Sequence, residues 1–125
     1  MQVEGSLRFV KRTALVVTLI VLSLAAVHRY HLDGLNGWLL SLGAEEDTEY
    51  AAGYSDKAFR NVRSGMTEAN VLALLGEPLE KSPRRPDGTE GWRYARSPSD
   101  ASYRVRVIRL RHGIVTSVRH HFYYD

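Results

Sequence analysis

The sequence predicts an α+β fold: two short helices packed on a three-stranded antiparallel sheet, preceded by one N-terminal transmembrane helix. Three features of the 125-residue chain support this prediction. An uncharged apolar stretch covers residues 13–27, two segments with helix-capping residues lie between 55 and 75, and apolar and polar residues alternate from about residue 90 onwards. Because an antiparallel sheet commonly buries only one face, we expect the two helices to cover one side of it.

The N-terminal segment is predicted to be a membrane anchor. As a helix, the uncharged residues 13–27 would span about 22 Å, which is less than the roughly 30 Å of a bilayer's hydrocarbon core. Basic side chains before this stretch can snorkel and Tyr30 can lie at the interface, so the predicted transmembrane anchor covers residues 13–32. A cleaved signal peptide is the alternative, with a mature start near Ala26, because small residues precede that position.

The charges around the anchor predict its orientation. Residues 1–12 form a basic segment, which the positive-inside rule places in the cytoplasm. Everything after the anchor then lies across the membrane, which in a bacterium means an inner-membrane protein with a periplasmic C-terminal part. The side chains expected at the membrane interface are Lys11, Arg12, Tyr30 and Trp38.

Residues 33–53 are predicted to connect the anchor to the domain. Their first part is an apolar patch around Trp38, which either lies in the membrane interface, docks on a partner's transmembrane helix or forms a surface helix under the domain. The following residues, 43–53, mix acidic residues with glycine and alanine and are typical of a solvated, flexible linker. Counted over residues 43–56, the charge is −5. Residues 57–125 carry +6, so an acidic linker precedes a basic domain.

Residues 54–125 are predicted to form the folded domain, which begins with two short helices. The first is expected at residues 55–62, with Phe59 buried. The second is expected at residues 67–75, because Thr67 can cap its start and Gly76 can end it.

Strands are expected to follow a proline-containing loop. They are predicted at about residues 90–96, 103–111 and 114–124. In the second strand the apolar phase shifts by one residue, which predicts a bulge near Val107. His112 and Gly113 are expected to form a two-residue turn, so that the last two strands make a hairpin.

Several residues of the domain follow the pattern of a known family. They are Gly65, Met66, Thr67, Val71, Leu72, Leu75, Gly76, Pro78, Trp92 and Tyr94, followed by the strand, turn and strand at the end. In this order they resemble the SmpA/OmlA family of outer-membrane assembly factor domains related to BamE. The resemblance covers about residues 54–125. It implies a fold similar to that of the β-lactamase inhibitor protein and a small, non-enzymatic periplasmic module that binds partners.

The chain departs from this family in one respect. Members of the assembly-factor branch are typically lipoproteins with an N-terminal cysteine, and this sequence contains no cysteine. An apolar helix would replace the lipid, which favours the inner membrane over the outer membrane. The lack of cysteine also excludes disulfides, thiolate metal sites and a cysteine nucleophile.

The domain contains no recognisable catalytic or metal-binding pattern. No serine or threonine is paired with a base in a known motif, and no glycine-rich phosphate loop is present. His120 and His121 are adjacent on a predicted strand and point to opposite faces, so they are not expected to share a metal ion. We therefore expect no enzymatic activity, no metal and no cofactor. Nucleic acid is not expected as a partner either, because lysine-rich clusters and aromatic stacking motifs are missing.

Arginines on the predicted strands are the most distinctive polar feature. The candidate contacts for a partner or an anionic surface are Arg93, Arg104, Arg106, Arg109, Arg111 and Arg119. Several of them should share the sheet face opposite the helices. This face is either simply solvated or a contact surface for a carboxylate-rich partner or anionic lipid headgroups, which guanidinium groups bind through two parallel hydrogen bonds.

Together these observations predict a non-enzymatic, membrane-anchored periplasmic interaction module of the bacterial cell envelope, with the resemblance suggesting a link to outer-membrane assembly. The alternative is an accessory single-pass subunit of an integral membrane complex, such as a respiratory, photosynthetic or transport assembly. The expected partners are envelope or integral membrane proteins, with anionic lipid headgroups as a further contact.

Overall fold

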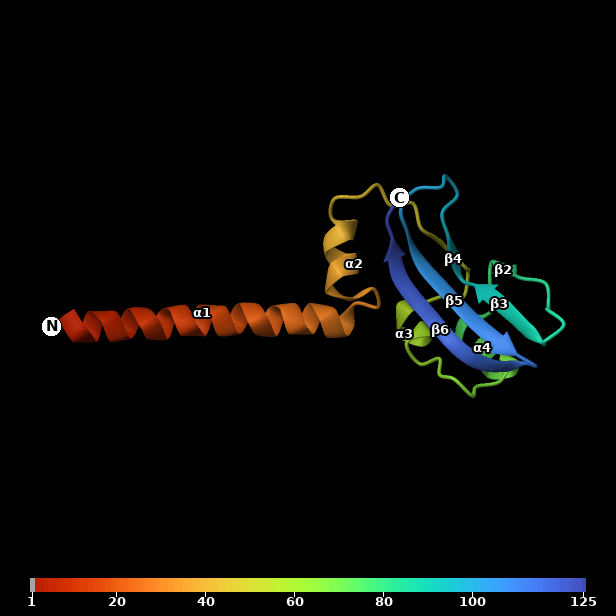
Figure 1. Ribbon diagram of the computed structural model, residues 1–125, viewed down its shortest axis with the longest axis horizontal. Helices are drawn as coiled ribbons and strands as arrows, with labels where there is room; N and C mark the ends of the chain where they lie inside the picture. Colours follow the sequence, from red (N-terminus) through yellow and green to blue (C-terminus); the bar gives the residue numbers. More distant parts are fainter. Residues whose placement is uncertain (1) are drawn as a thin grey trace.

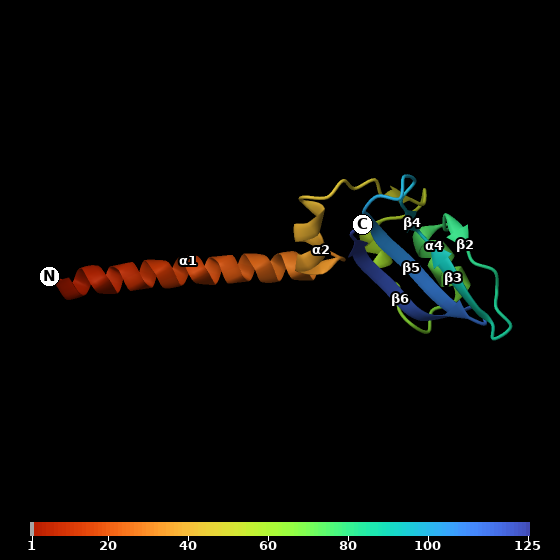
Figure 2. The same cartoon turned by 45° about the horizontal axis from the view of Figure 1, so that its top comes forward.

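The chain folds as an α+β protein in which one long helix stands apart from the rest (Figure 1). The computed structural model describes residues 2–125. Helix α1 (Gln2–Tyr30) projects as a rod from one side of a domain that contains all the strands, and Figures 1 and 2 show the same separation. The predicted fold class, an α+β domain after an apolar N-terminal helix, is therefore confirmed.

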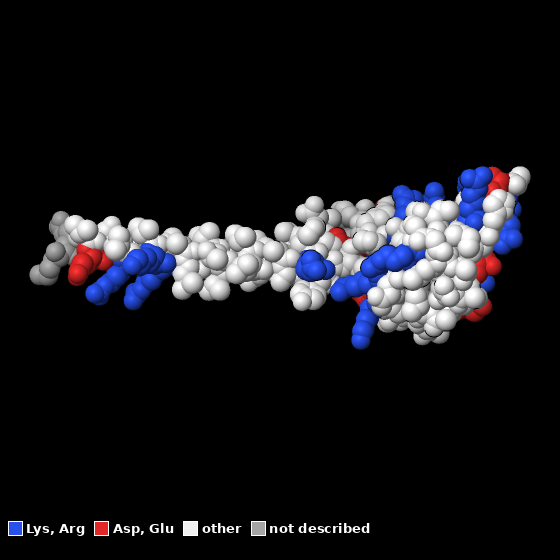
Figure 3. Space-filling view, turned by 90° about the horizontal axis from the view of Figure 1, so that it is seen from below, with Lys and Arg blue, Asp and Glu red and all other residues white. Residues whose placement is uncertain are grey.

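Helix α1 is long and apolar enough to cross a membrane. Its most apolar 18-residue window has a mean hydropathy of 2.0, and none of that window is buried by the rest of the chain. The hydroxyl groups of Thr13, Thr18 and Ser23 each donate to the carbonyl four residues earlier, which satisfies them within the helix. Figure 3 shows that the middle of α1 has no charged atoms, whereas basic side chains lie towards its N-terminus.

Two antiparallel sheets replace the expected single sheet of three strands. The larger has the order β2-β3-β5-β6, with β2 at Glu80–Lys81, β3 at Thr89–Arg93, β5 at Tyr103–Arg111 and β6 at Ile114–Tyr123. The smaller pairs β1 (Glu49–Tyr50) with β4 (Ala95–Arg96). The predicted strand at 90–96 is thus divided into β3 and β4, which belong to different sheets. The two-residue strands β1 and β2 were not expected, because they are too short to show alternation.

Two helices cover one face of the larger sheet. Helix α3 (Asp56–Phe59) is shorter than the predicted 55–62, whereas α4 (Glu68–Leu75) matches its prediction closely. Thr67 Oγ1 accepts from the N–H of Asn70 at 3.3 Å, and Gly76 ends α4 with a φ of 68°. The core between helices and sheet includes Phe59, Val62, Val71, Leu75, Trp92, Tyr94, Ile108, Leu110 and Val115.

The acidic residues 43–53 are packed on the domain and do not form the expected flexible linker. Their strand β1 pairs with β4, and the N–H of Ala51 donates to the carbonyl of Tyr94 at 2.9 Å. Asp47 Oδ2 accepts from the N–H of Ser99 at 3.0 Å. The negative charges that suggested a solvated tether are therefore partly used to hold this segment against a basic domain.

The hairpin of β5 and β6 forms as predicted, but its bulge lies elsewhere. His112 and Gly113 make the turn with φ values of 50° and 77°. The register shifts between Arg109 and Leu110, which face Ser117 and Val115. The phase change near Val107 thus has another cause, namely that an arginine occupies an inward position of β5 where an apolar residue was expected.

Candidate functional site

A buried ion pair joins the long helix to the domain. Asp33 lies in the turn between α1 and helix α2 (Gly34–Ser41), and its carboxylate reaches the middle of β5. Arg106 donates from Nη1 to Asp33 Oδ1 at 2.6 Å and from Nη2 to Asp33 Oδ2 at 2.9 Å. Both side chains are withdrawn from solvent, with 0% of Arg106 and 1% of Asp33 exposed. This two-pronged contact fixes the orientation of both groups as well as their distance.

Further hydrogen bonds satisfy the Arg106 guanidinium. Its Nε donates to the hydroxyl of Tyr54 at 2.8 Å, and its Nη1 also donates to the carbonyl of Val105 at 2.8 Å. Tyr54 in turn donates its own proton to Asp56. Four of the five N–H groups of Arg106 therefore have acceptors. A buried charge is tolerated when it is paired and hydrogen-bonded in this way.

Arg104 connects the acidic segment to the same site. It donates from Nη1 to Asp33 Oδ2 at 2.8 Å, and from Nε and Nη2 to the two carboxylate oxygens of Glu46 at 2.8 and 3.3 Å. Its backbone N–H donates to Thr48 Oγ1 at 3.0 Å. We call Asp33, Glu46, Arg104 and Arg106 the junction network, because together they attach α1 and the acidic segment to β5.

The electrostatics of the junction network favour the ionised forms. Burial alone would raise the pKa of Asp33, but the hydrogen bonds and charge of Arg106, followed by those of Arg104, outweigh it and hold this pKa below its ordinary value. Burial alone would lower the pKa of Arg106. The hydrogen bond to Asp33 outweighs this effect and holds the arginine pKa above its ordinary value. The pair therefore remains charged over the whole physiological pH range.

Helix α2 and the end of α1 also contact the last strand. Gly37 of α2 is buried, and a Cβ atom placed there would come within 3.2 Å of Phe122 on β6 and 2.5 Å of Asp33. The carbonyl of Leu32 accepts from Nδ1 of His120 at 2.6 Å, which requires the tautomer protonated at Nδ1. These contacts place the chain between α1 and α2 directly on the edge strand β6.

The six predicted arginines divide between the two faces of the sheet. Arg104 and Arg106 point to the face covered by helices, with 20% and 0% of their side chains exposed, so they do not lie on the face opposite the helices where a partner or lipid contact was expected. They share this face with Ile108 and Leu110, which continue the same alternation along β5. The sequence signal for their inward position is that they lie two and four residues before the inward-facing Ile108 on the same strand. Two arginines at alternate positions are, however, normally typical of a solvated face.

The other four predicted arginines lie on the opposite side, which we call the open face. The pairing of β3, β5 and β6 places Arg93, Arg109, Arg111 and Arg119 on it, together with Tyr103, Val105, Val107 and Tyr123. Arg93 forms an ion pair with Glu80 at 3.2 Å, and Arg111 donates to the carbonyl of Asp87 at 3.1 Å. Within the described part of the chain, Arg109 and Arg119 form no ion pair.

The residues expected at a membrane interface lie on either side of the uncharged stretch of α1. Arg12 and Tyr30 are separated by roughly 27 Å along one continuous helix, close to the thickness of a hydrocarbon core. Lys11 is next to Arg12. Trp38, on α2, is half-buried with its ring 6.4 Å from that of His31, so it lies at the same end as Tyr30.

The two adjacent histidines of β6 point to opposite faces of the sheet. Among residues 2–125, His, Asp and Glu side chains form no group of three that could hold a metal ion. His120 is turned towards Leu32 and the ring of Phe59, while His121 lies opposite Val105 on the open face. Comparison of the sequence with models of protein families and with curated proteins gives no match.

Proposed function

We propose that this chain is a non-enzymatic, single-pass protein of the bacterial inner membrane whose domain lies in the periplasm and binds other envelope proteins. The apolar helix α1 supports the membrane assignment, since no part of its apolar window is covered by the chain itself. The basic side chains near its N-terminus support a cytoplasmic N-terminus. The open face supports a binding role, because it presents arginines beside the exposed Tyr123 and the half-buried Val105 and Val107.

The observation that carries this proposal is the buried pair of Asp33 and Arg106. Asp33 is only three residues beyond the last residue of α1, and its carboxylate is fixed in the domain by two hydrogen bonds of 2.6 and 2.9 Å. The anchor and the domain are therefore parts of one folded unit.

The domain itself is proposed to be an SmpA/OmlA-like module. The order of α3 and α4, followed by β3, β5 and β6, supports the two-helix, three-strand core that the resemblance implies. The strands β1, β2 and β4 would be additions to that core. A contribution to outer-membrane assembly follows only from this resemblance and forms part of the proposal.

Topology reporters test the proposal directly. Alkaline phosphatase fused after Asp125 should be active and β-galactosidase at the same place inactive, since the first enzyme needs the periplasm and the second the cytoplasm. The intact mass of the membrane-extracted protein should include the residues of α1. An active β-galactosidase fusion would reverse the orientation, and a mature protein that starts near Ala26 would exclude the anchor.

A second candidate function is that of an accessory subunit in an integral membrane complex. It is favoured by α2 and its C-cap, where Leu39, Leu40 and the C-cap Leu42 are 52%, 44% and 68% exposed. These side chains could contact a neighbouring transmembrane helix as well as lipid. Stoichiometric co-purification with a multi-spanning protein in mild detergent, lost on changing Leu39 and Leu40 to serine, would favour this candidate over the first.

A further inference from the structure

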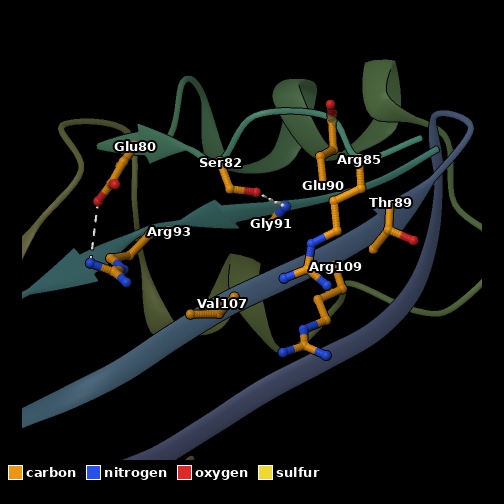
Figure 4. A pocket seen from close by; sticks show the side chains of 9 residues that line it. All are labelled: Glu80, Ser82, Arg85, Thr89, Glu90, Gly91, Arg93, Val107 and Arg109. Carbon is orange, nitrogen blue, oxygen red and sulfur yellow. Dashed lines mark hydrogen bonds and ion pairs between the residues drawn. The ribbon is translucent and has the colours of Figure 1, made fainter. Parts of the chain in front are cut away.

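The open face contains a basic hollow between β3, β5 and the loop after β2 (Figure 4). The hollow has a volume of about 290 Å³. The side chains that matter for its chemistry are Ser82, Arg85, Thr89, Arg93, Val107 and Arg109. Figure 4 shows Arg85 and Arg109 extending over the same part of the sheet, with Val107 forming part of the floor.

The charges of this hollow are only partly compensated. Arg93 pairs with Glu80 at 3.2 Å, but Arg85 and Arg109 have no carboxylate partner among the described residues. Glu90 is turned away, since its carboxylate accepts from Trp92 Nε1 at 2.9 Å and from Arg84 Nε at 3.1 Å (Figure 4). Two unpaired guanidinium groups beside one hollow repel each other and attract an anion that can lie between them.

The loop that carries Arg85 is held in place by backbone hydrogen bonds. The N–H of Arg85 donates to the carbonyl of Thr89 at 2.9 Å, and the N–H of Gly88 donates to the carbonyl of Arg85 at 2.9 Å. The N–H of His112 donates to the carbonyl of Gly88 at 3.0 Å, which ties this loop to the hairpin. The backbone of Arg85 is therefore ordered before any ligand binds, which reduces the entropy lost on binding.

A second hollow continues the first along the open face. It also has a volume of about 290 Å³ and shares Arg93, while Arg96, Tyr103 and Tyr123 are among its other lining residues. From Arg109 to Tyr103 the strand β5 rises roughly 20 Å, the length of about six extended residues. Asp100 and Asp125 also line this second hollow, so its charges are mixed. The basic part of the open face is the first hollow, where Arg85 and Arg109 lie with Val107, and it suits a segment that alternates carboxylate and apolar side chains.

The position of the basic hollow on the domain favours a protein ligand over lipid headgroups. Figures 1 and 2 show β3 and the hairpin turn on the side of the domain away from α1, and the sheet order places β3 next to the edge opposite the α2-bound strand β6. We expect the junction network to keep the domain from turning over on its anchor. Headgroups of the membrane that holds α1 are therefore out of reach of Arg85 and Arg109, and a protein segment is the better match.

We propose that the open face binds an extended acidic segment of a partner protein, with carboxylates paired to Arg85 and Arg109 and an apolar side chain packed on Val107. This inference rests on the proposed role of the domain as an interaction module. It adds the chemical class of the partner segment and the residues that recognise it.

Peptide binding to the purified full-length protein in detergent micelles tests the inference. The probe is a fluorescent hexapeptide in which Glu and Phe alternate, and its matched control has Gln in place of every Glu. We expect the acidic peptide to bind and the Gln peptide to bind at least tenfold more weakly. The double variant Arg85→Gln/Arg109→Gln should weaken acidic-peptide binding by about tenfold or more, because hydrogen bonds to two charged groups are lost.

A variant with the same charge change serves as the control. Lys57→Gln/Arg60→Gln alters α3 and its C-cap on the other side of the sheet and should change the affinity less than about twofold. An equal loss of acidic-peptide affinity in the two double variants would show that binding depends on net charge alone, and this result would overturn the inference. Loss of inorganic phosphate or phosphatidylglycerol nanodisc binding in Arg85→Gln/Arg109→Gln, without loss of peptide binding, would overturn it as well. Because these measurements do not depend on topology in the cell, a negative result here leaves the anchoring proposal untouched, and a reversed topology leaves this one untouched.

Discussion

Asp33 and Arg106 are 73 residues apart in sequence and form a two-pronged, solvent-excluded ion pair with N···O distances of 2.6 and 2.9 Å. The acid belongs to the turn after the long helix, and the base belongs to the central strand β5. This pair therefore decides how the anchor is mounted on the domain. The first three predictions concern its stability, its pH dependence and its effect on the motion of the domain.

Asp33→Asn should destabilise the protein by about 3–5 kcal/mol, because the buried charge of Arg106 then keeps only the more distant, half-exposed carboxylate of Asp56, at 3.6 Å. Urea unfolding of the full-length protein in detergent, followed by tryptophan fluorescence, measures the change. Glu77→Gln is the matched control, since it removes one carboxylate from an exposed pair with Lys81 and should change stability by less than about 1 kcal/mol. Similar values for the two variants would show that the junction pair contributes little.

The stability that Asp33 contributes should be lost in acid. Its pKa is lowered in the folded protein, so the unfolded chain takes up a proton more readily than the folded one as the pH falls. The contribution is complete above the ordinary carboxyl pKa of 3.8 and declines below it, as the pH falls towards the lowered value. Unfolding midpoints measured between pH 7 and pH 2 should fall less steeply for Asp33→Asn than for the unchanged protein, and parallel profiles would contradict the assignment.

The junction network should restrict the motion of the domain relative to α1. The chain has no cysteine, so spin labels can be placed at Tyr30→Cys and Glu77→Cys, both at exposed side chains. Distance measurements by electron paramagnetic resonance should give a narrow distribution in lipid nanodiscs. Adding Asp33→Asn should broaden it, while Glu49→Gln, which removes an exposed carboxylate that pairs with Arg96, should not.

Helix α2 should depend on the absence of a side chain at Gly37. A Cβ atom there would lie 2.5 Å from the Cβ of Asp33 and 3.2 Å from the Cβ of Phe122, so Gly37→Ala forces α2 away from β6. We expect a loss of about 1–3 kcal/mol in the free energy of unfolding and faster hydrogen exchange in α2. Gly43→Ala, which has nothing within 4 Å, should be close to neutral. Unchanged exchange in Gly37→Ala would show that α2 is not held by this contact.

The parts of the fold that the sequence predicts well are those determined by neighbouring residues. Thr67 and Gly76 mark the ends of α4 through their own capping chemistry, and His112 with Gly113 marks the hairpin turn. The alternation of β5 and β6 likewise follows from one buried face. In each case the signal and the structure that it predicts lie within a few residues of each other.

The junction network was not predictable in this way. Its partners lie 73 residues apart, and an arginine that alternates with valine on a strand has the same local pattern whether it faces solvent or a buried carboxylate. The opposite net charges of residues 43–56 and 57–125 indicate that the two segments attract each other, but they do not identify which residues form ion pairs. The same limit applies to β1 and β2, since two-residue strands form only where a partner strand is already in place.

The packing of residues 43–53 against the sheet also limits how far the domain can reach. Fully extended, these residues could span roughly 36 Å, enough to let a tethered domain explore a wide shell above the bilayer. With Glu49 and Tyr50 paired to β4 and Asp47 bound to Ser99, they run along the domain and do not form an extended tether. In a membrane the open face would then stand at a constant height above the lipid surface, and the partner segment would have to be presented at that height. The search for it would take place by lateral diffusion of the whole molecule.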